Sequence, residues 1–192
     1  MEADTSIKKI RKALGEYQNK APNVYVKAAN DTAMEARRLL IATAKKTYEI
    51  QALKVSTKSL EIKRAKKTKL QAELTIKGKV NDLFKFKTSP AKYNPEKRPK
   101  VVKARVLKSS SLKIVDKSAF LAKFKSGHVS IMKRKGKSRL PIKSFYGPSL
   151  PNIIKNEKVY GKISPEIENI LQKHIKNETQ KMLDREAAKT KE

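Results

Sequence analysis

The spacing of the apolar residues changes twice along this 192-residue chain. Up to residue 48, apolar side chains recur every three or four positions, which is the period of an amphipathic helix. Between residues 70 and 145 they alternate with polar residues, which is the period of a strand. From residue 164 the helical period returns. The sequence therefore predicts an α+β fold with N-terminal helices, a central antiparallel sheet with a basic hairpin, and a C-terminal amphipathic helix.

The same changes divide the chain into three parts of one expected domain. A chain of this length with 38% hydrophobic residues can bury one sizeable core, so a single domain over 1–192 is expected. Its parts are a helical N-terminal part (1–68), a β-rich basic core (69–147) and C-terminal helices (148–192).

Two helices are expected in the first 50 residues. The first follows the apolar spacing over residues 7–17. Pro22 suits the first turn of a new helix, and the pattern then continues over 24–48. A third, shorter helix is expected over residues 56–67, because Ser56 or Thr57 can cap it.

Alternation in the middle of the chain predicts strands over 70–76, 83–87, 101–107, 128–132 and 140–145. Residues 120–124 suit either a short helical piece or a strand. The proline-rich stretch 88–99 predicts an irregular loop, and Ser109–Ser111 predicts a turn. Lys135–Ser138 suits the turn of a hairpin, with Pro141 at an edge position because proline cannot donate to a ladder.

The C-terminal part begins where Tyr146-Gly-Pro-Ser-Leu-Pro151 ends the sheet and opens a short helix over 151–155. Ser164 as N-cap and Pro165 at the first helical position predict the start of the last helix. Its apolar face is expected to consist of Ile167, Ile170, Leu171, His174, Ile175 and Met182.

The charge of the chain is large and unevenly distributed. There are 47 Lys and Arg against 18 Asp and Glu, a formal net charge of +29. Residues 97–156 contain 17 basic residues and a single acidic one, Asp116, whereas residues 157–192 are almost neutral. Such a surplus repels itself and indicates a polyanion or an acidic partner. Only nine of the cations are Arg, so unspecific attraction is expected rather than recognition of bases.

The sequence lacks the residues that several classes of function require. The chain has no Cys, which excludes disulfides and thiolate metal sites. His128 and His174 have no second ligand that would suggest a metal site, so packing or incidental roles are expected for both. Gly136-Lys137-Ser138 lacks the upstream glycine of a phosphate-binding loop. We therefore expect no enzyme activity, no cofactor, no metal, no signal peptide and no membrane-spanning segment.

Cations gather around the expected hairpin turn: Lys133, Arg134, Lys135, Lys137 and Arg139. Cations this close together can contact adjacent phosphates or the acidic rim of a protein partner. Hairpin tips can also be charged only because they are solvated, and lysines on edge strands block aggregation. The clustering favours contact with a polyanion or an acidic partner.

The segment that follows this turn resembles a family signature. Arg139-Leu-Pro-Ile142, followed by Tyr146-Gly-Pro-Ser149 and an apolar helix start, is similar to the signature of the phage minor tail protein Z family. These are tail completion proteins of long-tailed double-stranded DNA phages. The order of helical, basic β-rich and helical parts is also similar, as are length and basicity. The resemblance is specific over residues 128–155.

This resemblance implies a structural role at the head–tail junction, late in virion assembly. It implies a homo-oligomeric ring subunit whose neighbours are tail and neck proteins, such as the tail terminator and the head-completion proteins. It further implies nonspecific contact with genomic double-stranded DNA, and a location in the virion tail or neck and in the host cytoplasm during assembly. The motif residues are then expected to form turns and anchor interfaces: Leu140, Pro141, Ile142, Tyr146, Gly147, Pro148 and Ser149.

Two other functions account for the same charge. One is a sequence-nonspecific nucleic-acid-binding protein of the nucleoid or the ribosome. Such proteins usually carry their cations on extended tails, whereas here the cations lie in segments that alternate like strands. The other is an adaptor that binds an acidic protein and no nucleic acid.

Overall fold

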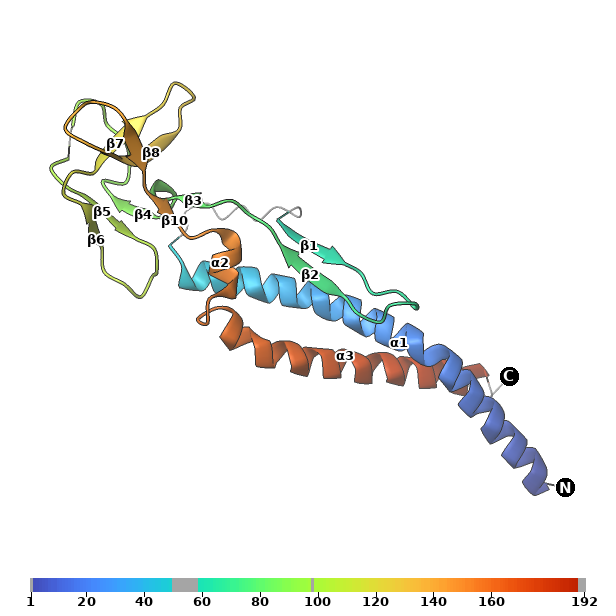
Figure 1. Ribbon diagram of the computed structural model, residues 1–192. Coiled ribbons are helices and arrows are strands. Elements are labelled where there is room, and N and C mark those ends of the chain that lie inside the picture. Colours follow the sequence, from blue (N-terminus) through green and yellow to red (C-terminus); the bar gives the residue numbers. More distant parts are fainter. Residues whose placement is uncertain (1, 50–58, 98, 190–192) are drawn as a thin grey trace. The chain divides into compact units, whose positions relative to one another are not determined.

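The computed structural model describes residues 2–49, 59–97 and 99–189 (Figure 1). The chain forms two compact units. The first comprises Met1–Arg38, Glu61–Thr75 and Ile163–Glu192, and the second comprises Leu39–Leu60 and Ile76–Lys162. Helices in the N- and C-terminal regions, with several antiparallel sheets between them in sequence, confirm the predicted α+β class. The single domain over 1–192 stays a prediction.

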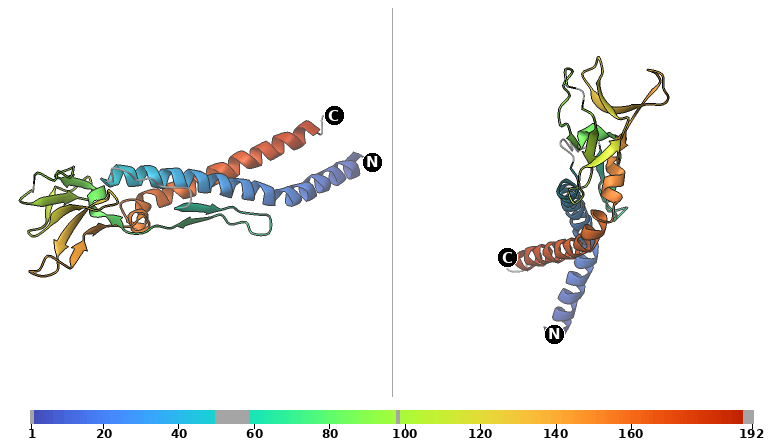
Figure 2. Two further views of the ribbon diagram at one scale, coloured as in Figure 1. Left: turned by 90° about the horizontal axis from the view of Figure 1, so that it is seen from above. Right: turned by 90° about the vertical axis from the view of Figure 1, so that its left-hand side faces the viewer.

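Two long helices make up most of the first unit. α1 is Glu2–Thr47, and α3 is Tyr160–Lys189. Within this unit they lie alongside each other and run in opposite directions (Figure 2). Val24, Ala28 and Ala36 of α1 are buried. The two alanines among them present little bulk, which lets a neighbouring element approach the helix closely.

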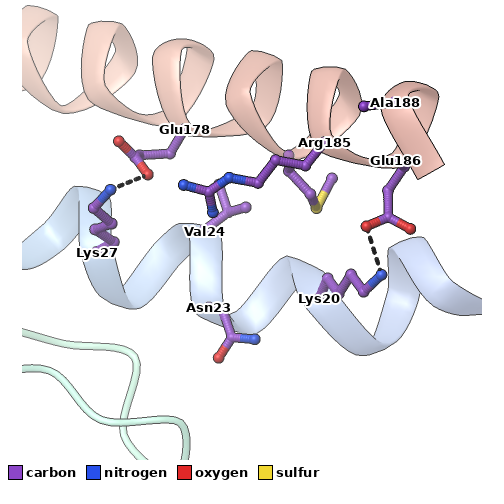
Figure 3. Close-up of a pocket in the computed structure, with 9 residues that line it drawn as sticks. Lys20, Asn23, Val24, Lys27, Glu178, Arg185, Glu186 and Ala188 are labelled. Atoms are coloured by element: carbon purple, nitrogen blue, oxygen red, sulfur yellow. Dashed lines mark hydrogen bonds and ion pairs between the residues drawn. The ribbon is translucent and has the colours of Figure 1, made fainter.

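Ion pairs connect α1 to α3 (Figure 3). Lys27 Nζ lies 2.7 Å from Glu178 Oε2, and Lys20 Nζ lies 2.7 Å from Glu186 Oε1. The buried Glu178 carboxylate also accepts a hydrogen bond from Lys181 at 2.8 Å. Hydrogen bonds from Lys181 and Lys27 hold the pKa of Glu178 below its ordinary value. The carboxylate therefore stays charged within the helix contact.

The predicted break between two N-terminal helices is wrong. α1 continues through Pro22, which has no N–H to donate to the carbonyl of Gln18. Such a proline costs about 3 kcal/mol in an isolated helix interior. Here Lys20 and Lys27, one on each side of the proline, both pair with α3. Tertiary contacts on both sides of the proline offset its cost. The spacing of apolar residues along one helix cannot predict such contacts.

The predicted helix over 56–67 is also wrong in its described part, while residues 56–58 lie outside the described residues. β1, Leu60–Lys63, pairs with β2, Glu73–Ile76, in a two-stranded sheet. Leu60 is fully buried, and exposed and covered side chains alternate along β1. This alternation is the strand period, and pairing with β2 stabilises it. The strand predicted over 70–76 is confirmed in its second half.

The loop between β1 and β2 is fastened to α1 by one side chain. The Asn30 amide accepts a hydrogen bond from the backbone N–H of Ala65 at 2.8 Å and donates one to the Ala65 carbonyl at 3.3 Å. Ala65 itself is buried. A single amide thus satisfies both backbone groups of a loop residue.

The described residues of the second unit form the end of α1, α2 and short strands in three antiparallel sheets, β4–β5–β6, β7–β8–β9 and β10–β3. Its elements are β3 Asn81–Asp82, η1 Leu83–Lys85, β4 Lys87–Ser89, β5 Val102–Arg105, β6 Lys113–Asp116, β7 Phe120–Lys123, β8 Val129–Arg134, β9 Ile142–Ser144, β10 Tyr146–Gly147 and α2 Leu150–Lys155. Side chains from several of these elements form its core, among them the fully buried Phe86, Val102, Ile131 and Ile153.

Most of the strands expected in this unit are confirmed, and residues 120–123 form a strand. The strand predicted over 83–87 is wrong over its first three residues, which form the 3₁₀ helix η1. Its cap explains the difference, because Asp82 Oδ1 accepts a hydrogen bond from the Phe84 N–H at 2.8 Å. A capped turn competes with an extended strand, and here the capped turn is the more stable of the two.

The last helix begins earlier than predicted. α3 starts at Tyr160, not after Ser164, and Pro165 lies inside it. The Asn156 carbonyl accepts hydrogen bonds from the backbone N–H groups of Val159 and Tyr160, both at 2.8 Å. The Asn156 side chain accepts from the Lys158 N–H at 3.0 Å. The turn made by Asn156 starts the helix before the Ser-Pro signal is reached.

Candidate polyanion-contact site

The predicted basic hairpin is formed by β8 and β9. Arg134 pairs with Ile142, and the Lys135 N–H donates to the Pro141 carbonyl at 3.0 Å. Beyond this bond the chain makes the turn over residues 136–140. The side chains of one group of cations, here called the basic tip, are exposed on and beside this turn: Arg134, Lys135, Lys137 and Arg139.

Lys133 differs from the basic tip. It lies directly opposite Lys143 in the ladder, a like-charge arrangement that is unfavourable by itself. Lys133 Nζ lies 3.0 Å from Asp116 Oδ2 and 5.9 Å from the centre of the Phe145 ring. The structure therefore gives Lys133 an internal anion, while its neighbours at the tip face solvent.

Hydrogen bonds hold the Asp116 carboxylate in place for that contact. Its Oδ1 accepts hydrogen bonds from the Ser118 hydroxyl at 2.7 Å and from the Ser118 N–H at 2.8 Å. These two bonds, together with the hydrogen bond from Lys133, hold the pKa of the Asp116 carboxyl well below its usual range. Asp116 thus remains ionised in mildly acidic solution.

The motif that follows the hairpin has a clear structural part. No side-chain atom could be added at Gly147 without meeting the buried Phe86 ring. The Pro148 carbonyl accepts a hydrogen bond from the Asn81 side chain at 2.8 Å. Ser149 is the N-cap of α2, and its hydroxyl accepts from the Asn152 N–H at 3.4 Å. These residues join β10 to β3 and start α2.

Other motif residues face solvent. Leu140 is 67% exposed and Tyr146 is 60% exposed, which is unusual for large apolar side chains. The Leu140–Pro141 peptide bond is cis. Pro141 directly precedes β9, which is an edge strand of the sheet β7–β8–β9, and this agrees with its predicted edge position. Ile142 is partly buried. A role of these residues as interface anchors stays a prediction.

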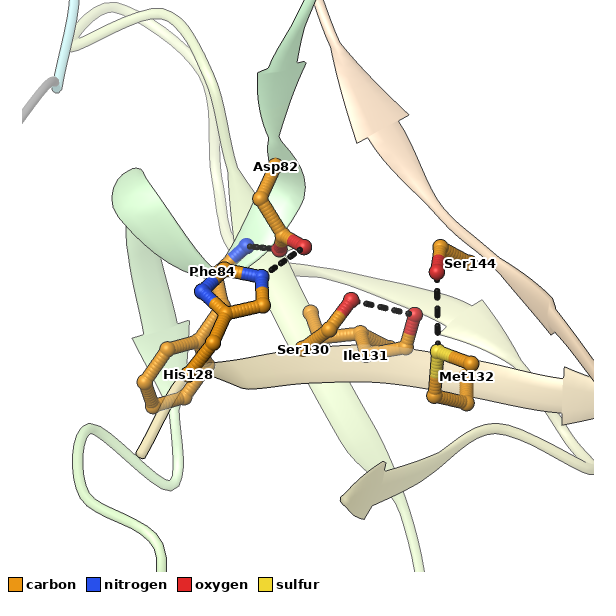
Figure 4. Close-up of polar contacts among 7 residues, drawn as sticks. All are labelled: Asp82, Phe84, His128, Ser130, Ile131, Met132 and Ser144. Atoms are coloured by element: carbon orange, nitrogen blue, oxygen red, sulfur yellow. Dashed lines mark hydrogen bonds and ion pairs between the residues drawn. The ribbon is translucent and has the colours of Figure 1, made fainter. Parts of the chain in front are cut away.

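A polar pair that the sequence pattern did not indicate lies at the start of β8 (Figure 4). His128 Nε2 lies 3.1 Å from Oδ2 of the buried Asp82. The His128 ring also stacks on Phe124, with ring centres 6.0 Å apart. In the first unit, His174 Nε2 lies 2.9 Å from Glu35 Oε2. Asp82 is the residue of this pair that the sequence could have indicated, because Asp side chains commonly accept a hydrogen bond from the backbone N–H two residues further on.

Replacing Asp82 by Ala is expected to reduce the free energy of unfolding by about 2 kcal/mol, because η1 loses its cap and His128 loses its partner. Asp82→Asn keeps the Oδ1 acceptor for Phe84 and is expected to cost clearly less. Urea unfolding of both variants measures the difference. Equal losses would mean that the charge of Asp82, and not its capping bond, stabilises this region.

A groove of about 490 Å³ lies between α1 and α3 in the first unit (Figure 3). Ion pairs occupy part of its wall, namely Lys20 with Glu186 and Lys27 with Glu178. In the described part of the chain, no group of three or more His, Asp or Glu side chains is arranged to hold a metal ion. Nor does any described helix have the length and apolarity needed to span a membrane.

Comparison with protein families first identifies the class, which is that of phage tail proteins. The chain belongs to the prophage minor tail protein Z (GPZ) family, whose model matches residues 4–185. This confirms the resemblance found in the sequence and implies a structural place in the tail with other tail proteins as neighbours. No curated protein and no solved structure matches the chain significantly.

Proposed function

We propose that this protein is a tail completion or neck protein that acts at the head–tail junction during virion assembly. In this proposal it is a ring subunit, it has no catalytic role, and a cationic surface of its second unit lies near the DNA channel. Its neighbours are the tail terminator and head-completion proteins.

The observation that carries the proposal is the distribution of charge. Residues 76–162 contain 24 Lys and Arg against four Asp and Glu. Two of these four acids are already bonded within the unit, Asp82 to His128 and Asp116 to Lys133. The surplus therefore has few internal partners and calls for an external polyanion. In a ring, each subunit would add its own surplus around the same axis, and attraction to a duplex backbone requires no base recognition.

Mass spectrometry of tailed particles purified on a density gradient tests the proposal. We expect this chain in intact particles at a ring-like copy number, from a few to about a dozen, counted against tail proteins of known stoichiometry. Absence from intact particles, together with recovery in the nucleoid or ribosome fraction of the host, would contradict it. That outcome would favour a nonspecific nucleic-acid-binding protein instead.

A further inference from the structure

A second group of cations in the second unit lies away from the hairpin turn, on the sheet β4–β5–β6 (Figure 1). Lys87 of β4 lies directly opposite Arg105 of β5, and Ser89 lies opposite Lys103. Thr88 and Val102, which alternate with them, are buried. Side chains of a strand alternate between two faces, so these residues share the outward face. On β4 and β5 the outer face is therefore formed by Lys87, Ser89, Lys103 and Arg105, and β6 adds one exposed apolar side chain, Ile114, opposite Lys103.

The cations on this outer face are arranged unfavourably for the isolated fold. Like charges directly opposite each other in an antiparallel pair are destabilising, and this applies to Lys87 and Arg105. Lys103 lies diagonally next to Lys87, at a distance of roughly 7–8 Å for such positions. The three positive charges on this face therefore repel one another and destabilise the isolated fold.

Only part of that repulsion is relieved internally. Glu49 forms an ion pair with Arg105, and Arg105 Nη1 donates to the Ser110 carbonyl at 3.4 Å. Arg105 Nε is buried and lacks a hydrogen-bond partner in the part of the chain that the structure describes. Lys87 and Lys103 are exposed and form no ion pair with any described residue. Two cations of this face are thus available to an external anion.

We infer that the outer face of β4–β5–β6 is a second contact surface for the phosphate backbone of duplex nucleic acid. The inference rests on the proposed function, to which it adds a specific surface. Lysine and serine side chains present hydrogen-bond donors, and a phosphodiester backbone is a continuous row of charged acceptors. No aromatic residue lies among these four positions, so base stacking is not part of the contact.

The experiment compares two double variants of the full chain with equal change in charge. Lys87→Gln with Lys103→Gln alters the outer face. Lys173→Gln with Lys176→Gln alters exposed positions of α3 in the first unit. Fluorescence anisotropy measures binding to a mixed-sequence duplex of ~30 base pairs at several salt concentrations. Each lost phosphate contact lowers the slope of log affinity against log salt by about 0.9.

For the outer-face variant we expect a slope smaller by about 1.8 and an affinity reduced roughly tenfold at ~100 mM salt. The α3 variant should bind as the wild type does. The melting temperature of the outer-face variant should not fall, because Lys87→Gln removes a like-charge opposition. This thermal control separates loss of contact from loss of fold.

Three outcomes would overturn the inference. If both double variants lose the same affinity, only net charge matters and the outer face is no contact surface. If the outer-face variant loses binding to polyglutamate of matched charge but not to duplex, its ligand is an acidic protein. If the wild type binds no duplex even at ~50 mM salt, the DNA contact of the proposed function fails with the inference. In the first two outcomes the junction role stands.

Discussion

Reversing the basic tip to Glu is expected to lower the yield of infectious particles by about 100-fold or more while the protein stays folded. The variant carries Arg134→Glu, Lys135→Glu, Lys137→Glu and Arg139→Glu. All four side chains are exposed, and such substitutions usually change stability little. Four reversed charges would repel the phosphates or carboxylates that the tip attracts, which affects both encounter and affinity. Complementation of a phage that lacks this gene measures the yield.

Lys133 is left unchanged in this variant for a structural reason. Its ammonium group bonds to Asp116, so Lys133→Glu would place two carboxylates against each other and disturb the sheet. A variant that reversed Lys133 together with the basic tip would therefore combine a loss of contact with a loss of stability. The four-residue variant separates the two effects.

A matched control reverses four exposed lysines of the first unit: Lys66, Lys67, Lys173 and Lys176. The change in net charge is the same, so an effect confined to the basic tip must depend on position. Equal losses in both variants would contradict the contact hypothesis, because bulk charge would then suffice. Unfolding of the tip variant, seen by circular dichroism, would mean that the stems of these side chains cover the core.

The second large effect is expected at Gly147, where Gly147→Ala should reduce the free energy of unfolding by about 3 kcal/mol. A Cβ atom there would meet three atoms of the Phe86 ring, with Cζ at 2.9 Å and Cδ2 at 3.0 Å. Phe86 is fully buried, so its ring cannot move aside without disturbing the core. Thermal unfolding should show a melting temperature lower by roughly 6–12 °C.

Gly136 provides the control for this substitution. It lies in the hairpin turn, and a Cβ atom there would meet nothing within 4 Å. Gly136→Ala should therefore change stability by no more than about 0.5 kcal/mol. Adding Phe86→Leu to Gly147→Ala should restore part of the loss, because the smaller side chain leaves room for the methyl group. A Gly147→Ala protein as stable as Gly136→Ala would show that the close approach is not required.

The elements that the sequence predicted well are those specified by near neighbours. The strands β5, β8 and β9 follow the alternation of their own residues, and the hairpin turn lies between two of them. The start of α2 follows from Ser149 and the proline after it. In these cases the residues that decide the structure lie within a few positions of one another.

Two of the errors, at Pro22 and at β1, arise where a distant residue decides, whereas the errors at η1 and at the start of α3 come from local turns at Asp82 and Asn156. α1 continues through Pro22 because α3, far along the chain, holds the helix on both sides. The strand β1 depends on pairing with β2 beyond a loop. The spacing of nearby apolar residues does not reveal either partner, and tertiary contacts override local preference.

The candidate site shows the same division. The cations of the basic tip could be named from sequence because they lie within six residues of one another in the hairpin. Their separation from Lys133 could not, since its partner Asp116 comes from a different strand. The outer face of β4–β5–β6 depends on register, which places Lys87 opposite Arg105 across a long loop. Charge composition predicts an anionic partner, and the register of the strands adds a second candidate surface to the one that the sequence names.

The double hydrogen bond between Asn30 and Ala65 has a consequence for how the first unit opens. The loop cannot lift from α1 by losing one bond at a time, because the same amide holds the donor and the acceptor of Ala65. Separation of the loop therefore breaks both bonds in one event. Local opening at this point links the helix and the β1–β2 loop into one cooperative unit, so that neither frays independently of the other there.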